Sequence, residues 1–337
     1  MSQTIGQDGQ SFFGYAGIAE ESTYGGGATP TEYLNVVSDG FTGDNNPIYL
    51  STTRGRDTYE AIAGEFDDDG SLDFPVTPEA VGLMLKAAFG SASVTTSDPD
   101  GDGTDEVGTH TFTTADKIPS LSVELGLGDV DAVRHTGVGV ESLDLEHSAG
   151  ERLSMSTDLP AKEPDGSVNR STPSYDSLRA LVYHDATFSL FGTDRTVDLQ
   201  DLTSSLTNSL TKHTRGSRTP AKMSVGQREV VFEATLDFEN SDVMERFWGS
   251  AGATGPEDEL HEGSLNAKWV SPETIEDTTT AYSLELDAPR VTINTHDAQL
   301  NEQDLIAENV ELRALVDTGG AGYDVQATLV NGRTTAY

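Results

Sequence analysis

The sequence has 337 residues, which is enough for two ordinary domains, and it contains no cysteine. Its 57 Asp and Glu residues outnumber 20 Lys and Arg residues, so the formal net charge is −37. This balance argues against a protein that grips DNA or RNA, because phosphates are held by Lys and Arg. The missing cysteines exclude disulfides and thiolate metal sites.

The charge also indicates the solvent in which the chain folds. Self-repulsion of this size opposes a compact state at low salt, and multimolar salt screens it. We therefore predict a protein from a high-salt cytoplasm. The alternative is an unusually acidic protein from a cytoplasm of ordinary salt concentration. No apolar run is long enough to span a bilayer, and residues 1–4 lack the features of a signal peptide. We expect a cytosolic product without a membrane partner.

The first segment, residues 1–30, is a polar, glycine-rich arm with an apolar island at 12–18. It is too polar to fold alone, so we expect it to dock on the first module or on a neighbour. Alternating apolar and polar residues then predict a series of strands. In the first half these are 33–37, 48–56, 60–66, 71–74, 120–125, 138–146 and 152–159, with an acidic turn at 67–70.

One strong helix is predicted between these strands. Thr77 can cap its N-terminus, and Pro78 suits the first helical position. The apolar run that follows ends at Gly90, a typical stop signal. Such an apolar helix is expected to press onto a sheet.

The second half follows a polar linker at residues 161–173. A shorter helix is predicted at 242–248, capped by Asn240 or Ser241. Leu202, Leu206 and Leu210 fit either a strand or a short helix. The strands expected here are a hairpin of 186–191 with 195–199, followed by 229–238, 264–270, 281–286, 310–316 and 323–330.

The two halves repeat three landmarks in the same order, which indicates a duplication. In the first half these are Thr53-Arg54-Gly55-Arg56, Leu72-Asp73-Phe74 and Phe89-Gly90-Ser91. In the second half they are Thr214-Arg215-Gly216-Ser217-Arg218, Leu236-Asp237-Phe238 and Trp248-Gly249-Ser250. We infer two related modules, at residues 31–160 and 174–337.

The Arg-Gly loops of both modules concentrate cations that are scarce elsewhere. The residues concerned are Arg54, Gly55, Arg56, Lys212, Arg215, Gly216 and Arg218. These loops either pair with carboxylates of their own module or contact an acidic neighbouring subunit. We favour the subunit contact, because Arg pairs bidentately with carboxylates and exposed ion pairs within a chain gain little.

An acidic loop offers the only metal candidates in the sequence. Asp98, Asp100 and Asp102 match the first half of an EF-hand calcium loop, but the twelfth position falls at Thr109, which cannot chelate as a bidentate Glu does. The other interpretation is a solvated turn, which is common in acid-rich chains, and we favour it.

No motif indicates catalysis. The seven histidines lack zinc-ligand spacing, and neither a nucleophile elbow nor a phosphate-binding loop is present. Acidic pairs are so frequent that none stands out as a general acid and base. We expect no enzyme, no catalytic residue and no cofactor.

Several segments, taken in order, resemble the tail tube proteins of long-tailed viruses. The arm 14–25 resembles the opening of that family. Segments 34–36, 70–74 and 77–90 resemble its first module, and 109–112 with 119–125 resemble its middle. The similarity covers most of residues 12–160 and, more loosely, the remainder. The acidic bias would suit a virus of halophilic archaea.

This resemblance implies a mainly β fold of two tandem β-sandwich or partial-barrel modules, each with one flanking helix. It implies a structural virion protein whose rings stack into a tube for DNA delivery. Six modules commonly make a ring in such families, so two modules per chain imply a trimer with pseudo-sixfold symmetry; a merely decorating second half would imply six chains. The implied partners are other copies, a tape measure protein and a tail terminator, with DNA passing through unbound. Assembly would occur in the host cytoplasm.

Two other functions remain open at this point. A secreted or surface-exposed tandem β-domain adhesion protein would need a secretion signal. A β-rich glycosidase would need paired carboxylates in a cleft lined by aromatic side chains, and the chain has only two tryptophans. Self-assembly in high salt is expected of the tube protein alone.

Overall fold

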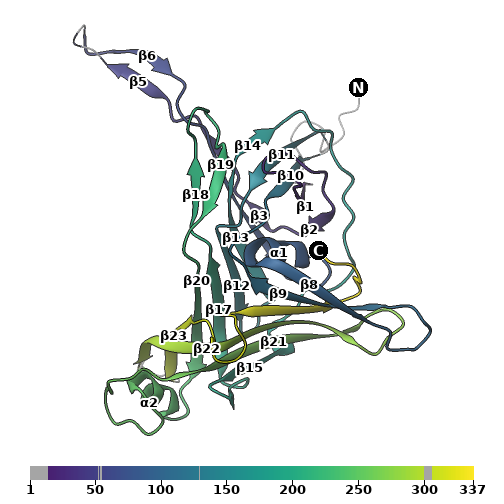
Figure 1. Ribbon diagram of the computed structural model, residues 1–337, viewed down its shortest axis with the longest axis vertical. Helices are drawn as coiled ribbons and strands as arrows, with labels where there is room; N and C mark the ends of the chain where they lie inside the picture. Colours follow the sequence, from purple (N-terminus) through teal and green to yellow (C-terminus); the bar gives the residue numbers. More distant parts are fainter. Residues whose placement is uncertain (1–13, 52, 54, 129, 300–305) are drawn as a thin grey trace, which may run out of the picture.

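The computed structural model describes residues 14–51, 53, 55–128, 130–299 and 306–337, and it confirms a mainly β fold (Figure 1). Within those residues, no helix combines the length and apolar character needed to cross a membrane. Most strands belong to one large antiparallel sheet that contains residues from both halves of the chain.

The central part of this sheet, here called the spanning sheet, crosses from one half to the other. Its strands alternate buried and solvent-facing residues, so only one face is apolar. In order, the strands are the second part of β22 (Ala281–Gln299), β23 (Ala307–Ala314), β20 (Glu229–Asp237), β17 (Leu199–Thr207), β12 (Ser142–Ser148), β13 (Ser154–Ala161) and β7 (Asp67–Pro75), ending with β3 (Ser38–Asp39) and β4 (Thr42–Asp44), which both pair with β7.

A back layer covers the apolar face of the spanning sheet. The long strand β22 connects the two layers, because its first part pairs with β24 and its second part with β23. The strands of the back layer are β16 (Thr193–Asp194), β15 (Ala186–Leu190), β21 (Glu262–Thr274), the first part of β22, β24 (Gln326–Asn331), β9 (Val107–Thr114) and β8 (Gly90–Ser97).

A separate side sheet contains the N-terminal arm. The apolar island forms β1 (Tyr15–Glu20), whereas Phe12 and Phe13 lie outside the described residues. The Tyr15 hydroxyl donates to buried Glu124 at 2.5 Å. Burial raises the pKa of Glu124, but hydrogen bonds from Tyr15 and other donors outweigh it and hold that pKa below its usual range. The arm thus docks on its own chain. The other strands are β2 (Glu32–Leu34), β10 (Leu121–Leu127), β11 (Asp131–Val138) and β14 (Glu163–Asp165).

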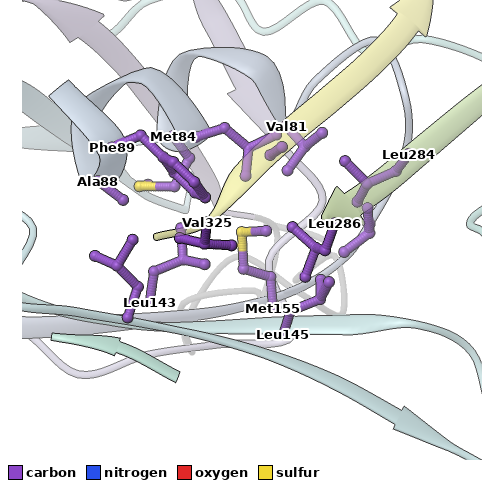
Figure 2. Packing of buried hydrophobic residues seen from close by; sticks show 14 of the residues in the cluster. Val81, Met84, Ala88, Phe89, Leu143, Leu145, Met155, Leu284, Leu286 and Val325 are labelled. Atoms are coloured by element: carbon purple, nitrogen blue, oxygen red, sulfur yellow. The ribbon is translucent and has the colours of Figure 1, made fainter. Parts of the chain in front are cut away.

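The core lies between the spanning sheet and the back layer and includes helix α1 (Gly82–Phe89). Figure 2 shows Met84 and Phe89 of α1 facing Leu143 and Met155 of the spanning sheet, with Leu286 of β22 beside them. All five side chains are nearly inaccessible to solvent. Burying one such side chain stabilises the fold by roughly 1.5–3 kcal/mol. One continuous apolar cluster therefore joins residues of both halves.

The predicted start of α1 is too early. Residues 77–81 form a separate turn, and the helix begins at Gly82, because the Thr77 hydroxyl donates to Asp176 instead of capping the helix. The predicted stop is confirmed, since Gly90 has a φ of 93° and donates its amide to the Lys86 carbonyl. Helix α2 (Asp242–Trp248) has the predicted bounds, and Asn240 accepts the Asp242 amide.

The acidic turn predicted at 67–70 is wrong, because these residues are part of strand β7. Side chains from distant segments stabilise this acidic run within a strand. His135 hydrogen-bonds buried Asp68 at 2.7 Å, and the Lys212 ammonium lies 2.6 Å from Asp69. The strand expected at 60–66 is β6 (Thr58–Ile62), which pairs with β5 (Ile48–Ser51) rather than with β7.

Two further expectations in the second half are resolved. Leu202 and Leu206 lie on a strand, β17. The predicted second hairpin strand at 195–199 is wrong, because β15 pairs with the two-residue β16, and only Leu199 of that range lies in a strand. Leu210 begins the separate strand β18 (Leu210–His213), which pairs with β19 (Lys222–Val225). The predicted linker also contains the short strand β14.

The pairing order of the strands repeats between the halves. The order β14-β11-β10-β1-β2 of the side sheet matches β24-β22-β21-β15-β16, and β7-β13-β12 matches β20-β23-β22. The hairpins β5–β6 and β18–β19 precede β7 and β20, and helices α1 and α2 follow them. Strands β8 and β9 have no counterpart among the described residues of the second half. This repeat supports a duplication; the exact module boundaries stay a prediction.

The junction between the halves depends on a buried side chain. Asn208, which follows β17, donates its side-chain amide to the carbonyls of Ala88 and Val140, each at 3.0 Å. These acceptors lie near the end of α1 and before β12, so a single amide joins three segments.

We expect Asn208→Ala to lower the free energy of unfolding by about 1–3 kcal/mol, because it leaves two buried carbonyls without that donor. Denaturant unfolding at fixed salt measures the change. Asn294→Ala is the matched control, since Asn294 is exposed and donates only to Glu311 at the surface; its effect should stay within about 0.5 kcal/mol. Equal effects of the two substitutions would contradict the assigned role.

Candidate assembly surfaces

The solvent-facing side of the spanning sheet is one continuous polar surface across both halves. Pairing keeps the solvent-facing residues in register, as in Ser142–Thr207 and Glu146–Thr203 across the junction of β12 and β17. Acidic residues recur on most of its strands, and the described strands place no aromatic side chain on this face. The carboxylates include Asp69, Asp73, Asp144, Glu146, Asp158, Asp201, Glu233, Asp237, Asp297 and Glu311.

Like charges face each other on this surface. Glu233 of β20 lies directly opposite Glu311 of β23. Directly opposed like charges destabilise a sheet by roughly 0.2–1 kcal/mol. A chain with such pairs on an open face is expected to gain stability as salt screens them.

The two Arg-Gly loops lie at the ends of two-stranded hairpins. Residues 52–57 connect β5 to β6, and residues 214–221 connect β18 to β19. Figure 1 shows both hairpins extending from the same end of the molecule, with β5–β6 projecting furthest. Both Arg-Gly segments are therefore placed at hairpin tips, and their role as ring contacts stays a prediction.

The second loop contacts the first half of the same chain. Lys212 lies 2.6 Å from Asp69 and 3.5 Å from Asp67, and the Arg218 guanidinium donates to the Gly64 carbonyl at 2.9 Å. We expected this loop to contact either its own module or another subunit. The contacts match neither expectation, because they join the two halves of one chain. They show how an Arg-Gly hairpin can bind an adjacent module.

The remaining loop residues are arranged differently. Arg56, Arg215, Gly55 and Gly216 are exposed, and their contact with another subunit stays a prediction. Arg54 lies outside the described residues.

An apolar feature that the sequence analysis did not single out lies below the first Arg-Gly loop. Ile48, Tyr49, Leu50, Tyr59 and Ile62 of the β5–β6 hairpin are each at least 44% exposed. Large apolar side chains gathered on one projection indicate a surface that is covered in an assembly. The sequence pattern that could have revealed this surface is a polar Arg-Gly loop with apolar residues before and after it.

The acidic loop brings its carboxylates together. Oxygen atoms of Asp98, Asp100, Asp102 and Glu106 lie within 4.8 Å of one another. The glutamate of this cluster is therefore Glu106, three residues before Thr109. Hydrogen bonds from the backbone of Gly103 and neighbouring residues hold the pKa of Asp98 below its usual value. The pKa of Glu106 is raised by partial burial and by the nearby aspartates. Such a loop is stable as a turn, and calcium binding stays untested.

A calcium titration distinguishes the two interpretations of this loop. The favoured solvated turn predicts no saturable site, so heats of calcium addition should be the same for the parent chain and for Asp98→Asn. The solvated turn is rejected if the parent binds one ion and Asp98→Asn and Glu106→Gln both abolish it. Asp105→Asn, which removes a carboxylate outside the cluster, is the matched control.

We also expect Glu233→Gln to raise the melting temperature at low salt, because it removes the repulsion from Glu311. The gain should disappear in multimolar salt, where the repulsion is already screened. Thermal unfolding over a salt series measures both effects. Glu239→Gln removes one charge at an exposed position outside the spanning sheet; if its gain matches that of Glu233→Gln, net charge and not the opposed pair is responsible.

Comparison with known proteins identifies the family. The family model described as "phage tail tube protein" matches residues 14–314, which is most of the chain. No curated protein sequence matches significantly. Membership implies a structural protein of the virion tail that assembles with copies of itself and with other tail proteins. The polar face, the projecting hairpins and the repeated modules fit that role, and the chain belongs to the family of phage tail tube proteins.

Proposed function

We propose that this chain forms the stacked rings of a viral tail tube, a conduit for delivering DNA, and that each ring holds three chains with pseudo-sixfold symmetry. The observation that carries the proposal is the join between the halves, where β12 pairs with β17 from Ser142–Thr207 to Ser148–Asp201. One chain already holds two related modules side by side in one sheet. Three chains would supply six.

An open sheet edge supports closure into a ring. Strands β3 and β4 pair with β7 on one side, and no described strand pairs with their other side. Thr42, Gly43 and Asp44 are all exposed. In the repeat, β17 takes the place of β3 and β4, and its edge is covered by β12 of the preceding module. A preceding chain would cover β3 and β4 in the same way, which removes an edge prone to aggregation.

The continuous polar face is suited to line the channel. Its carboxylates repel phosphate, and the described strands offer no aromatic platform on which bases could stack. DNA would therefore pass without specific binding. The charges also repel each other, so we propose that the tube assembles in the high-salt cytoplasm of a haloarchaeal host of a tailed virus. A tape measure protein and a tail terminator would be its partners there.

Electron microscopy of the purified protein, concentrated in multimolar salt, tests this proposal. We expect stacked rings whose class averages show three chains and six similar lobes. The same protein at low salt is the matched condition and should yield fewer rings, because repulsion is unscreened. Six chains per ring would refute the trimer, and persistent monomers at every salt concentration would refute the tube.

A further inference from the structure

The hairpins β5–β6 and β18–β19 correspond at the first strand of each. Tyr49 lies four residues before the Thr of its Arg-Gly landmark, and Leu210 lies four residues before the Thr of the other. Tyr49 pairs with Ala61, as Leu210 pairs with Val225. Nearer the tip the hairpins differ, because a register shift between Leu50 and Ser51 interrupts β5–β6, whereas β18–β19 stays in register. The face of β5–β6 that contains Tyr49 and Ala61 thus corresponds to the face that contains Leu210, Met223 and Val225.

The internal hairpin is docked on the first half of its own chain. Leu210, Met223 and Val225 line a shared pocket with Ile118 and Gly139. The contact is close, since a Cβ atom added to Gly139 would lie 2.5 Å from Leu210 and 2.9 Å from Met223. The apolar face of β18–β19 is therefore used to join two modules.

The equivalent face of β5–β6 is uncovered in the single chain. Tyr49 is 64% exposed. An exposed tyrosine on a projecting hairpin is a typical interface anchor, because it supplies large contact area at low cost in side-chain entropy.

The matching acceptor surface is also uncovered. Strands β10 and β21 each have a register shift, between Leu121 and Val123 in one and between Gly263 and Leu265 in the other. Aligning these shifts places Leu260 at the position of Ile118, each three residues before the shift. Leu260 is 68% exposed, whereas Ile118 is partly covered and lies against the internal hairpin.

We infer that the Tyr49 face of one chain docks beside Leu260 on the second half of a neighbouring copy, as Leu210 docks beside Ile118 within the chain. The inference rests on the proposed ring and names its contact. The two surfaces cannot meet within one chain, because Figure 1 shows β5–β6 at one end of the long axis and α2, with the segment that leads to β21, near the other end.

Paired cysteines test this contact, since the chain has no cysteine of its own. The variant Tyr49→Cys/Leu260→Cys is assembled in high salt, treated with a short bismaleimide linker and separated on a denaturing gel. Both positions are exposed, so the substitutions should leave the fold intact. We expect covalent dimers and trimers to replace the monomer, and the series to stop at the number of chains in the ring, because the links close a circle.

Three comparisons make the result decisive. Leu210→Cys/Ile118→Cys should link within one chain and leave a monomer, which proves that the linker spans the equivalent contact. Tyr49→Cys/Val130→Cys places an exposed cysteine on the first half instead and should give no oligomers. Rings without covalent oligomers from Tyr49→Cys/Leu260→Cys, or a ladder without an upper limit, would overturn this docking and leave the proposed ring intact. A failure of every variant and the parent to form rings would instead refute the proposed function.

Discussion

The hydrogen-bonded seam between β12 and β17 is the constraint on which the rest of the structure depends. It fixes the halves in one register, so each solvent-facing residue of the first half continues a row of solvent-facing residues in the second. If β12 slipped by one residue, Leu143 would turn outward while Leu206 of β17 stayed inward, and Asp144 would enter the core. Because the apolar cluster extends across the seam, the two modules cannot separate without exposing it.

The seam also gives equivalent segments unequal surroundings. The β18–β19 hairpin rests on a module that the chain itself supplies, whereas β5–β6 has no such support among the described residues. In the ring proposed above, each chain contains one such junction and would form the other with the next subunit. The exposed Tyr49 and the Arg-Gly tip of β5–β6 would then lie at that second junction.

Local signals predicted the parts of this structure that local chemistry decides. Asn240 and Ser241 marked the start of α2, and the alternation around Leu143 and Leu159 marked the β12–β13 hairpin. The acidic run at Asp68 was misassigned because its partners, His135 and Lys212, are 67 and 144 residues away. Residues close to Asp68 in the sequence cannot reveal partners that lie so far away along the chain.

Other features were undecidable from the sequence for a simple geometric reason. Leu202 and Leu206 are four residues apart, a spacing that suits both the strand period of two and the helix period of 3.6. The candidate surfaces were predicted only in part. The scarcity of cations pointed to both Arg-Gly loops, but the exposure of Tyr49 and Leu260 depends on which modules meet, and that information is in the fold alone.

The placement of β24 sets the order in which the sheet can form. Residues 326–331 pair with β9 in the first half and with β22 in the second, so this strand completes a layer that begins more than 200 residues earlier. Contacts of such long sequence separation form slowly. Until they form, β9 presents one unpaired edge and the core stays open. The packing of the first half therefore waits for a strand that is synthesised after most of the second half.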